Sequence, residues 1–507
     1  MFTVLIIFLL TLPFLLFIFS KWRYSYWKRK GVLQLEPEFF YGNIKKLLTA
    51  QFSLGYTYLE LYEKFKKLKV RHGGIYRFFS PQYIPLDVEI VKCILQKDFV
   101  HFSGRGLYTH EKDLMTQTLF RMEGEPWKHL RAKLSPTFTS GKLKSMFDTL
   151  LNKIEGLEIM ANDCVVAGEP INIKDVSARF TTDVIGSCAF GLECDSMRDG
   201  NCEFRINGNK IFAPRIFSQW VETLIPWKLL SYTGYRSFGD VREFFETIVT
   251  ETIYYRSKNN VERKDFMQLL IQMKKSGQSN QLSKGETETI GLTNDEIIAQ
   301  CFLFFSAGYE TSASTMTFTL YELAKNPKIQ NKVREEIKHK VNKNGKITYD
   351  ALVEMTYMDK VIQETLRKYP PVSVIPRICT QNYKVPGTNV VIEKGTTVQI
   401  PVLGIHMDPD YYPDPGKYDP ERFTEENKAK RPEFSWLGFG EGPRICIGLR
   451  FGMLQSKIGL VGLLRDYSFT LNENTPTPLV YQCGTFITQF IFIPYPSHAV
   501  ATRSTSL

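Results

Sequence analysis

The strongest constraint on the fold is a long, mostly apolar segment in the second half of the chain. It opens with Thr293-Asn-Asp-Glu296, the capping-box pattern that starts a helix, and it continues to Lys325, just before Asn-Pro. A helix of this length spans about 50 Å and could cross the whole molecule. Much of it is apolar on every side, as over 301–305, so we expect a buried helix at the centre of the fold.

The rest of the chain predicts an α+β fold that is mainly α. Residues 73–92 alternate apolar and polar positions, which indicates a small sheet. Helical periodicity dominates from Glu123 to Lys368, with a last helix over 349–368. No linker or repeat divides the chain, so one large unit is the simplest interpretation. The final third is expected to contain strand-like segments (372–402), a Pro/Asp-rich stretch (408–420), a Gly-rich loop (435–448), a helix (449–466) and a β-rich tail.

Charge and cysteine usage narrow the classes of function. The chain carries a net charge of +11, but its basic residues are spread along helix-like segments and form no dense block. We therefore expect no nucleic-acid partner, and an acidic protein or an anionic membrane surface fits better. The nine cysteines are odd in number and include no C-x-x-C pair, which argues against a disulfide framework or a zinc site. This usage indicates a reducing compartment.

The N-terminus predicts a membrane anchor. Residues 2–19 are uncharged and long enough for one crossing of about 18–20 residues. Basic residues follow this run and none precedes it, whereas a cleaved signal peptide would show the reverse charge order. We predict a transmembrane signal anchor (1–20), a basic linker (21–37) and a large body (38–507) that faces the cytosol.

A Gly-rich loop, F-G-E-G-P-R-I-C-I-G over 439–448, leads directly into the helix 449–466. A cysteine at a helix N-terminus should be a stabilised thiolate, because the helix dipole and free N–H groups favour negative charge. Gly442 and Gly448 would let the backbone turn tightly and pass close to a flat ligand. For a lone Cys446, a buried free thiol after a turn would be the plainer interpretation. However, five fixed residue types in ten positions arise by chance in about one of a few thousand such chains.

Through this loop the chain resembles the cytochrome P450 family, from the anchor to the C-terminal strands. The resemblance implies a haem-thiolate monooxygenase fold, haem b as cofactor, and a catalytic haem-binding domain over 38–507. It also implies that Cys446 is the iron ligand, in a loop shaped by Phe439, Gly442 and Gly448, and that the thiolate favours O–O cleavage. The segments 134–142 and 439–452 are similar to the microsomal insect branch that oxidises plant toxins and insecticides.

Four further residues match the family's contacts to the haem propionates. In Trp127-Lys-His-Leu-Arg131 the tryptophan and the arginine have this role, and Arg377 and Arg444 match other propionate contacts. Arginine suits the task because its planar fork can grip a carboxylate with two hydrogen bonds. An amphipathic helix with an exposed arginine would be the plainer interpretation of the first motif alone.

Glu364-Thr-Leu-Arg367 is a second structural signature. Its spacing places both charged side chains on one helix face. The resemblance implies that this pair joins Arg422 of Pro420-Glu-Arg-Phe423 and holds the core around the haem-binding loop. By itself the pattern is weak, because a surface ion pair would satisfy it equally well.

Ala307-Gly-Tyr-Glu-Thr311 lies in the middle of the long apolar segment. Small residues there would leave room for dioxygen, whereas a buried acid and hydroxyl need a reason. Structurally, Thr311 could bond to a carbonyl one turn earlier and Glu310 could reach a salt bridge. We favour the catalytic roles that the resemblance implies, in which Thr311 holds the activated oxygen and Glu310 relays protons, since an unpaired buried carboxylate is costly.

The resemblance also implies partners and substrates. Electrons would come from an NADPH-cytochrome reductase, with cytochrome b5 as a further candidate, because no G-x-G-x-x-G fingerprint for binding NADPH follows a strand here. Apolar segments predict a lipophilic substrate, most often a foreign compound, oxidised at the endoplasmic reticulum membrane. A biosynthetic oxidase of an endogenous hormone or lipid, and a non-catalytic haem-binding or sensor protein, are the alternatives. The expected substrate contacts are Phe120, Phe304, Ala307, Val374 and Phe486.

Overall fold

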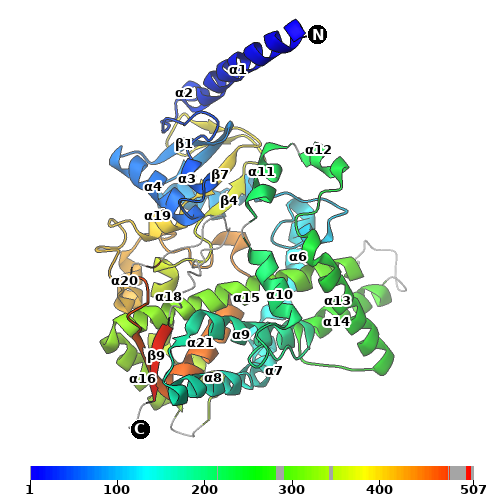
Figure 1. Cartoon of the computed structure of the whole chain (residues 1–507), viewed down its shortest axis with the longest axis vertical. Helices are drawn as coiled ribbons and strands as arrows, with labels where there is room; N and C mark the ends of the chain where they lie inside the picture. The colour runs from blue at the N-terminus through cyan, green and yellow to red at the C-terminus, as the bar shows by residue number, and fades with distance from the viewer. Residues whose placement is uncertain are drawn as a thin grey trace.

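The computed structural model of the chain describes residues 2–213, 215–225, 227–280, 291–341, 346–477, 479 and 498–503. Figure 1 shows a body built mainly of helices, with small sheets that lie largely apart from them. This arrangement confirms the prediction of a mainly α, α+β fold with small sheets.

The elements have the following bounds. The α-helices are α1 (Phe2–Tyr24), α2 (Tyr26–Arg29), α3 (Lys45–Leu48), α4 (Leu54–Lys67), α5 (Val88–Lys92), α6 (Gly124–Leu134), α7 (Ser140–Leu151), α8 (Ile154–Ala167), α9 (Ile173–Ile185), α10 (Glu203–Phe212), α11 (Ile216–Leu224), α12 (Trp227–Leu230), α13 (Gly239–Asn259), α14 (Phe266–Asn280), α15 (Asn294–Lys325), α16 (Pro327–Val341), α17 (Tyr349–Val353), α18 (Thr356–Lys368), α19 (Val402–His406), α20 (Glu425–Lys430) and α21 (Leu449–Leu464). Short π and 3-10 turns are η1 (Cys93–Lys97), η2 (Phe99–Phe102), η3 (Leu114–Thr116), η4 (Ser135–Phe138), η5 (Gly186–Phe190), η6 (Ser231–Thr233), η7 (Pro420–Phe423) and η8 (Gly442–Arg444). The strands are β1 (His72–Arg77), β2 (Ser80–Pro85), β3 (Ile171–Asn172), β4 (Ile375–Ile378), β5 (Tyr383–Lys384), β6 (Val391–Ile392), β7 (Thr397–Ile400), β8 (Tyr467–Leu471) and β9 (His498–Arg503).

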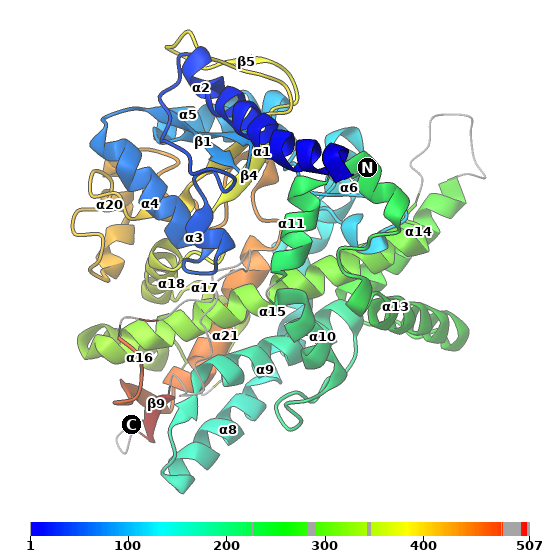
Figure 2. The same cartoon turned by 45° about the horizontal axis from the view of Figure 1, so that its top comes forward.

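The long helix α15 crosses the middle of the body, as Figures 1 and 2 show. Its start is the predicted capping box, because Glu296 N donates to Thr293 Oγ1 at 3.1 Å and Thr293 N donates to Glu296 Oε2 at 2.8 Å. Its 32 residues span about 48 Å. Most of its side chains are buried in the main hydrophobic core, where it packs against α9, α13 and α21. The prediction of a central buried helix is confirmed.

The main sheet has the strand order β1-β2-β7-β4, in which β2 and β7 run parallel and the other neighbours antiparallel. It is shorter than the sheet predicted over 73–92, because β2 ends at Pro85. Asp87 then starts helix α5, since its carboxylate accepts a hydrogen bond from Glu89 N at 2.8 Å. This cap turns the last apolar residues of the predicted strand into a short helix.

The helix predicted over 349–368 is two helices, α17 and α18. The backbone leaves the helical conformation at Met355, with φ −77° and ψ 76°. The carboxylate of Glu336 on α16 accepts hydrogen bonds from the N–H groups of Tyr357 and Met358, both at 2.8 Å. The cap for α18 therefore comes from another helix, which local periodicity cannot reveal.

Helix α1 projects from the end of the body that holds the main sheet (Figures 1 and 2). Its C-terminal half contacts the body through Phe19, whose ring centroid lies 5.6 Å from that of Phe79. Arg23 Nε donates to Phe79 O at 3.1 Å. The side chains of residues 2–10, 12 and 13 lie outside the description. Among the described residues, no helix has both the length and the apolar character of a membrane span.

Candidate functional site

The cysteine loop (residues 437–448) leads into α21 and is fixed by its own backbone. Gly440 N donates to Leu437 O at 2.9 Å, and Cys446 N donates to Phe439 O at 2.9 Å. The Cys446 side chain has exposed surface. Burial by the surrounding chain nevertheless raises the pKa of its thiol, against the opposing effects of the Gly448 N–H and the charges of Arg131 and Arg105.

This direction differs from the prediction that the position before the helix makes Cys446 a stabilised thiolate. Burial disfavours the charged form of Cys446 more strongly than the adjacent N–H group and cations favour it. A cation placed directly at the sulfur, such as a bound metal, would reverse that balance. The thiolate of Cys446 is therefore not the favoured form in the chain alone.

The two predicted glycines have different roles in this loop. Gly442 has a φ of +75°, and a Cβ there would lie 1.9 Å from Leu95 O. Glycine is required at this position because the loop packs closely against η1. Gly448 has a φ of −89°, and a Cβ there would meet only the Phe138 ring, at 3.8 Å. The structure gives no backbone reason for glycine at 448.

Three arginines from distant segments form a cationic cluster, in which Arg377 and Arg444 are buried and Arg105 is half-buried. Burial lowers the pKa of Arg377 to about 9 and that of Arg444 to about 10, and it lowers the pKa of Arg105 well below its ordinary value. The positive charges of Arg377 and Arg444 lower the pKa of Arg105 further, and the opposite charge of Cys446 raises it. Among the described residues, the buried Nε of each arginine has no hydrogen-bond partner, and no carboxylate lies within 4.0 Å of a guanidinium nitrogen. The charge of Glu123 nevertheless reaches Arg444 and partly opposes the lowering of its pKa. Such a cluster needs anionic partners.

Two of the predicted arginines are oriented by α6. The Arg444 guanidinium stacks on the Trp127 ring, 4.1 Å from its centroid, and Nη2 donates to Met122 O at 2.7 Å. Arg131 lies one turn after Trp127 and is half-buried, and the charge of Cys446 opposes the lowering of its pKa by burial. The structure thus places Trp127, Arg131, Arg377 and Arg444 around one region near Cys446.

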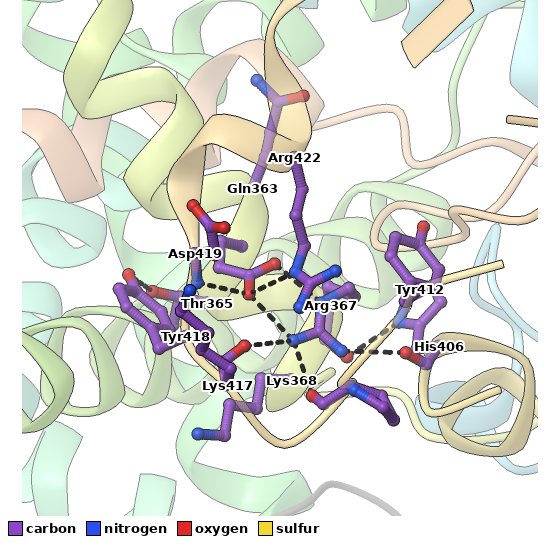
Figure 3. Close-up of polar contacts among 12 residues, drawn as sticks. Gln363, Thr365, Arg367, Lys368, His406, Tyr412, Lys417, Tyr418, Asp419 and Arg422 are labelled. Atoms are coloured by element: carbon purple, nitrogen blue, oxygen red, sulfur yellow. Dashed lines mark hydrogen bonds and ion pairs between the residues drawn. The ribbon is translucent and has the colours of Figure 1, made fainter. Parts of the chain in front are cut away.

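Glu364 and Arg367 form a completely buried pair, with Nε–Oε2 at 2.7 Å and Nη2–Oε1 at 2.8 Å. Glu364 Oε1 also accepts Asp419 N at 2.9 Å and lies 3.5 Å from Arg422 Nε. In Figure 3, Arg367 lies between His406 and Tyr412 on one side and Tyr418 and Asp419 on the other. The structure therefore brings together the three residues that the sequence had grouped.

The centre of α15 shows the structural alternatives that the sequence had left open. The Thr311 hydroxyl donates to Ala307 O at 2.6 Å, one turn earlier. The Glu310 carboxylate forms an ion pair with Lys174 of α9, and Ser314 Oγ donates to it at 2.8 Å. The premise that Glu310 would be unpaired is wrong, because Lys174 reaches it from the neighbouring helix. Ala307 is exposed although it lies midway along the central helix.

Comparisons with known proteins agree with this geometry. The family model described as Cytochrome P450 matches residues 44–491. The chain belongs to the cytochrome P450 family. Its relatives include the probable cytochrome P450 6a23 of Drosophila melanogaster, which is 42% identical over 92% of this chain and 93% of its own length. Cytochrome P450 6A1 of Musca domestica is 43% identical over 91% of both chains, and cytochrome P450 6k1 of Blattella germanica is 40% identical over 94% of this chain and 93% of its own length.

Cytochrome P450 proteins are oxidoreductases that bind haem b. The two propionates of haem b match the need of Arg105, Arg377 and Arg444 for anionic partners. A cysteine thiolate is one of the ligands that proteins supply to haem iron, and Cys446 has exposed surface close to the charges of Arg131 and Arg105. The residues present in this P450 therefore fit the cofactor.

Sequence reasoning missed Arg105. Its position is set by Glu123, whose Oε1 accepts the N–H groups of Arg105 and Gly106 at 2.8 and 2.7 Å. The guanidinium stacks on Phe120, with Cζ 3.8 Å from the ring centroid. Arg105 belongs to no motif, and only its position beside the other two arginines identifies it.

The predicted substrate contacts have different surroundings in this P450. Phe120 is half-buried against Arg105, and Ala307 is exposed at the centre of α15. Phe304 packs in the helical core, with ring centroids 5.3 Å from Phe138 and 5.6 Å from Phe266, because it faces η4 and α14. Val374 is buried in the core around the main sheet. Phe486 lies outside the described residues.

Proposed function

We propose that this P450 is a haem-thiolate monooxygenase that inserts one atom of dioxygen into lipophilic small molecules, chiefly foreign compounds. The observation that carries the proposal is the group of three arginines, Arg105, Arg377 and Arg444, whose Nε atoms are buried without a hydrogen-bond partner among the described residues. The charge of Arg105 also reaches Cys446. In this role the arginines hold the propionates and Cys446 binds the iron. Haem supplies oxygen activation when it is bound.

Thr311 and Glu310 are the proposed catalytic residues beside that site. Thr311 is half-buried and follows the exposed Ala307 by one turn, so its hydroxyl can turn from the Ala307 carbonyl to an oxygen substrate. Glu310 can deliver a proton only if it separates from Lys174 or passes the proton through Ser314. The ion pair therefore adds a step that the sequence interpretation did not include.

An electron donor is the proposed partner, namely an NADPH-cytochrome reductase, with cytochrome b5 as an alternative donor at the same face. Lys128, Lys142 and Arg450 are exposed on α6, α7 and α21. Helix α21 follows the cysteine loop directly, and α6 contacts it where Arg444 stacks on Trp127. Lys128 also lies 3.6 Å from Glu125. Arg450 Nη1 lies 3.4 Å from Ser140 Oγ and so joins α21 to α7. This face offers positive charge for an acidic partner. Lys144 is less available because it pairs with Asp350 at 3.1 Å.

We also propose that the protein is held at the endoplasmic reticulum membrane by its N-terminus, with the body in the cytosol. The uncharged run 2–19 and the basic residues after it support this anchor. Exposed apolar side chains on α12 and beside it, Trp227, Leu229 and Tyr232, could contact lipid. Trp220 of α11 packs against Phe78 at 5.6 Å and contributes less exposed surface.

The test is turnover by the purified full chain with a reductase, NADPH and lipid vesicles under labelled dioxygen. A chemically varied panel of lipophilic plant toxins and insecticides should give several products, each with one labelled oxygen atom. Conversion of a single hormone or lipid alone would favour a biosynthetic oxidase. NADPH consumption with no oxygenated product from any compound would favour a non-catalytic haem protein.

A further inference from the structure

A buried histidine connects the Glu364–Arg367 pair with the cysteine loop. His406 ends α19 and has no exposed surface. Its Nδ1 lies 3.0 Å from Arg367 O, and Leu437 N donates to its Nε2 at 2.8 Å. Arg367 Nη1 donates to His406 O at 2.9 Å, so two hydrogen bonds join these residues in opposite directions. Figure 3 shows His406 next to Arg367.

The two partners of the imidazole fix its tautomer. A backbone N–H can only donate, so Nε2 must be the unprotonated nitrogen that accepts from Leu437. A backbone carbonyl can only accept, so Nδ1 carries the hydrogen and donates it to Arg367 O. Only the neutral ring in this tautomer satisfies both groups. The imidazole is therefore a directional connector between two backbone segments.

Leu437 is the first residue of a hydrogen-bonded path to Cys446. It is buried, its carbonyl accepts Gly440 N at 2.9 Å, and two residues later Phe439 O accepts Cys446 N at 2.9 Å. If Nε2 is lost, the Leu437 N–H is left buried without a partner, which is costly. The start of the cysteine loop would then lose its hydrogen bond to α19 and keep the weaker one from Trp436 Nε1 to Gln363 O of α18, at 3.3 Å.

We propose that His406 is a positioning residue that ties the Glu364–Arg367 pair to the cysteine loop and so holds Cys446 where it binds iron as a thiolate. The acceptor nitrogen, Nε2, is the atom that does this. The inference deepens the proposed function and rests on it, because it presupposes that Cys446 is the ligand. His406 itself does not touch the reacting atoms and acts through Leu437.

Two variants separate the two ring nitrogens. His406→Gln places an amide oxygen at the reach of Nε2 and can still accept from Leu437. His406→Asn reaches only as far as Nδ1, so it keeps a donor for Arg367 O and leaves Leu437 N–H unpaired. His339→Asn, at an exposed position on α16, is the control.

The measurement is the absorption spectrum of the reduced, carbon-monoxide-bound holoprotein, followed over time, with thermal unfolding recorded in parallel. We expect His406→Asn to lose the red-shifted thiolate band about tenfold faster than the wild type, and His406→Gln and His339→Asn to match the wild type. If His406→Asn yields no folded holoprotein, His406→Gln still tests the inference, because this variant must keep the thiolate band.

Two results would overturn the inference. One is a thiolate band that persists equally in both His406 variants while both lose thermal stability, which would make His406 a packing residue only. The other is a His406→Gln protein that loses the band as fast as His406→Asn. Failure of the proposed function looks different, because the wild type would then lack the band or Cys446→Ser would keep it.

Discussion

The carboxylate of Glu310 in α15 forms an ion pair with the ammonium of Lys174 in α9, and both side chains are largely buried, with 4% and 14% exposed. Ser314 Oγ donates to the same carboxylate at 2.8 Å. Glu310 directly precedes Thr311 and is the acid proposed to relay protons. Through its ion pair with Lys174, the same side chain also joins two core helices. Stability and proton delivery should therefore be coupled at this pair.

Removal of one partner of this pair should destabilise the protein. Lys174→Met leaves Glu310 buried with only Ser314 as a partner, and we expect the free energy of unfolding to fall by about 3 kcal/mol. The double variant Lys174→Met/Glu310→Gln removes both charges and should recover to within about 1 kcal/mol of the wild type. Denaturant unfolding of the variants and the wild type measures this. A double variant no more stable than the single one would show that the charges are not the cause.

Thr311→Ala should uncouple NADPH consumption from product formation. The hydroxyl contributes little to stability because its present bond to Ala307 O is local. Its loss should lower the product formed per NADPH by about tenfold or more, as for other residues that handle protons in catalysis. Thr317→Ala is the matched control, since Thr317 Oγ1 donates to Ala313 O at 2.7 Å in the same helix. Equal losses in both variants would contradict a role for Thr311 in oxygen chemistry.

Arg105→Met should have opposite effects on the haem-free and haem-bound protein. Without an anion, Arg105 is a half-buried cation beside Arg377 and Arg444, so its removal should stabilise the haem-free chain. With haem, the variant loses a charged hydrogen bond and should release the cofactor about tenfold faster. Haem transfer to an acceptor protein, with exposed Arg198→Met as control, measures the rate. Unchanged haem release would mean that Arg105 does not hold a propionate.

His406 should make stability fall in mild acid. Burial, with a further contribution from the Arg367 charge, lowers its pKa from 6.5 to about 3 in the folded protein. Below pH 6.5, His406 therefore binds a proton in the unfolded chain but stays neutral in the folded protein. The free energy of unfolding falls as the pH falls from 6.5 toward 3. Between pH 8 and 5.5 the wild type should lose about 1.4 kcal/mol more than His406→Gln. Equal losses, measured by denaturant unfolding at both pH values, would show that His406 is protonated in the fold.

Much of the fold could be predicted because its signals are local. The capping box at Thr293 and the apolar run after it define α15, and the pattern around Cys446 identifies the loop before α21. One prediction failed because a distant residue decides the local structure, since Glu336 caps α18 from another helix. Another failed on a local signal that the alternating pattern concealed, namely the Asp87 cap that starts α5.

The residues of the candidate site also divide into those that the sequence identifies and those that only the fold identifies. Arg444 belongs to the cysteine-loop pattern and Arg377 matches a family contact, so both could be named from the sequence. Arg105 could not, because its role depends on the arginines that the fold places beside it. Lys174 is similar. It lies 136 residues before Glu310, and only the packing of α9 against α15 brings the two charges together.

The central claim is that Cys446 binds haem iron as a thiolate. The most direct test is the absorption spectrum of the reduced, carbon-monoxide-bound protein, recorded for the wild type and for Cys446→Ser. The account predicts a strongly red-shifted Soret band in the wild type that is absent from the variant. A band typical of imidazole ligation in freshly folded wild-type protein, unchanged by the substitution, would contradict it.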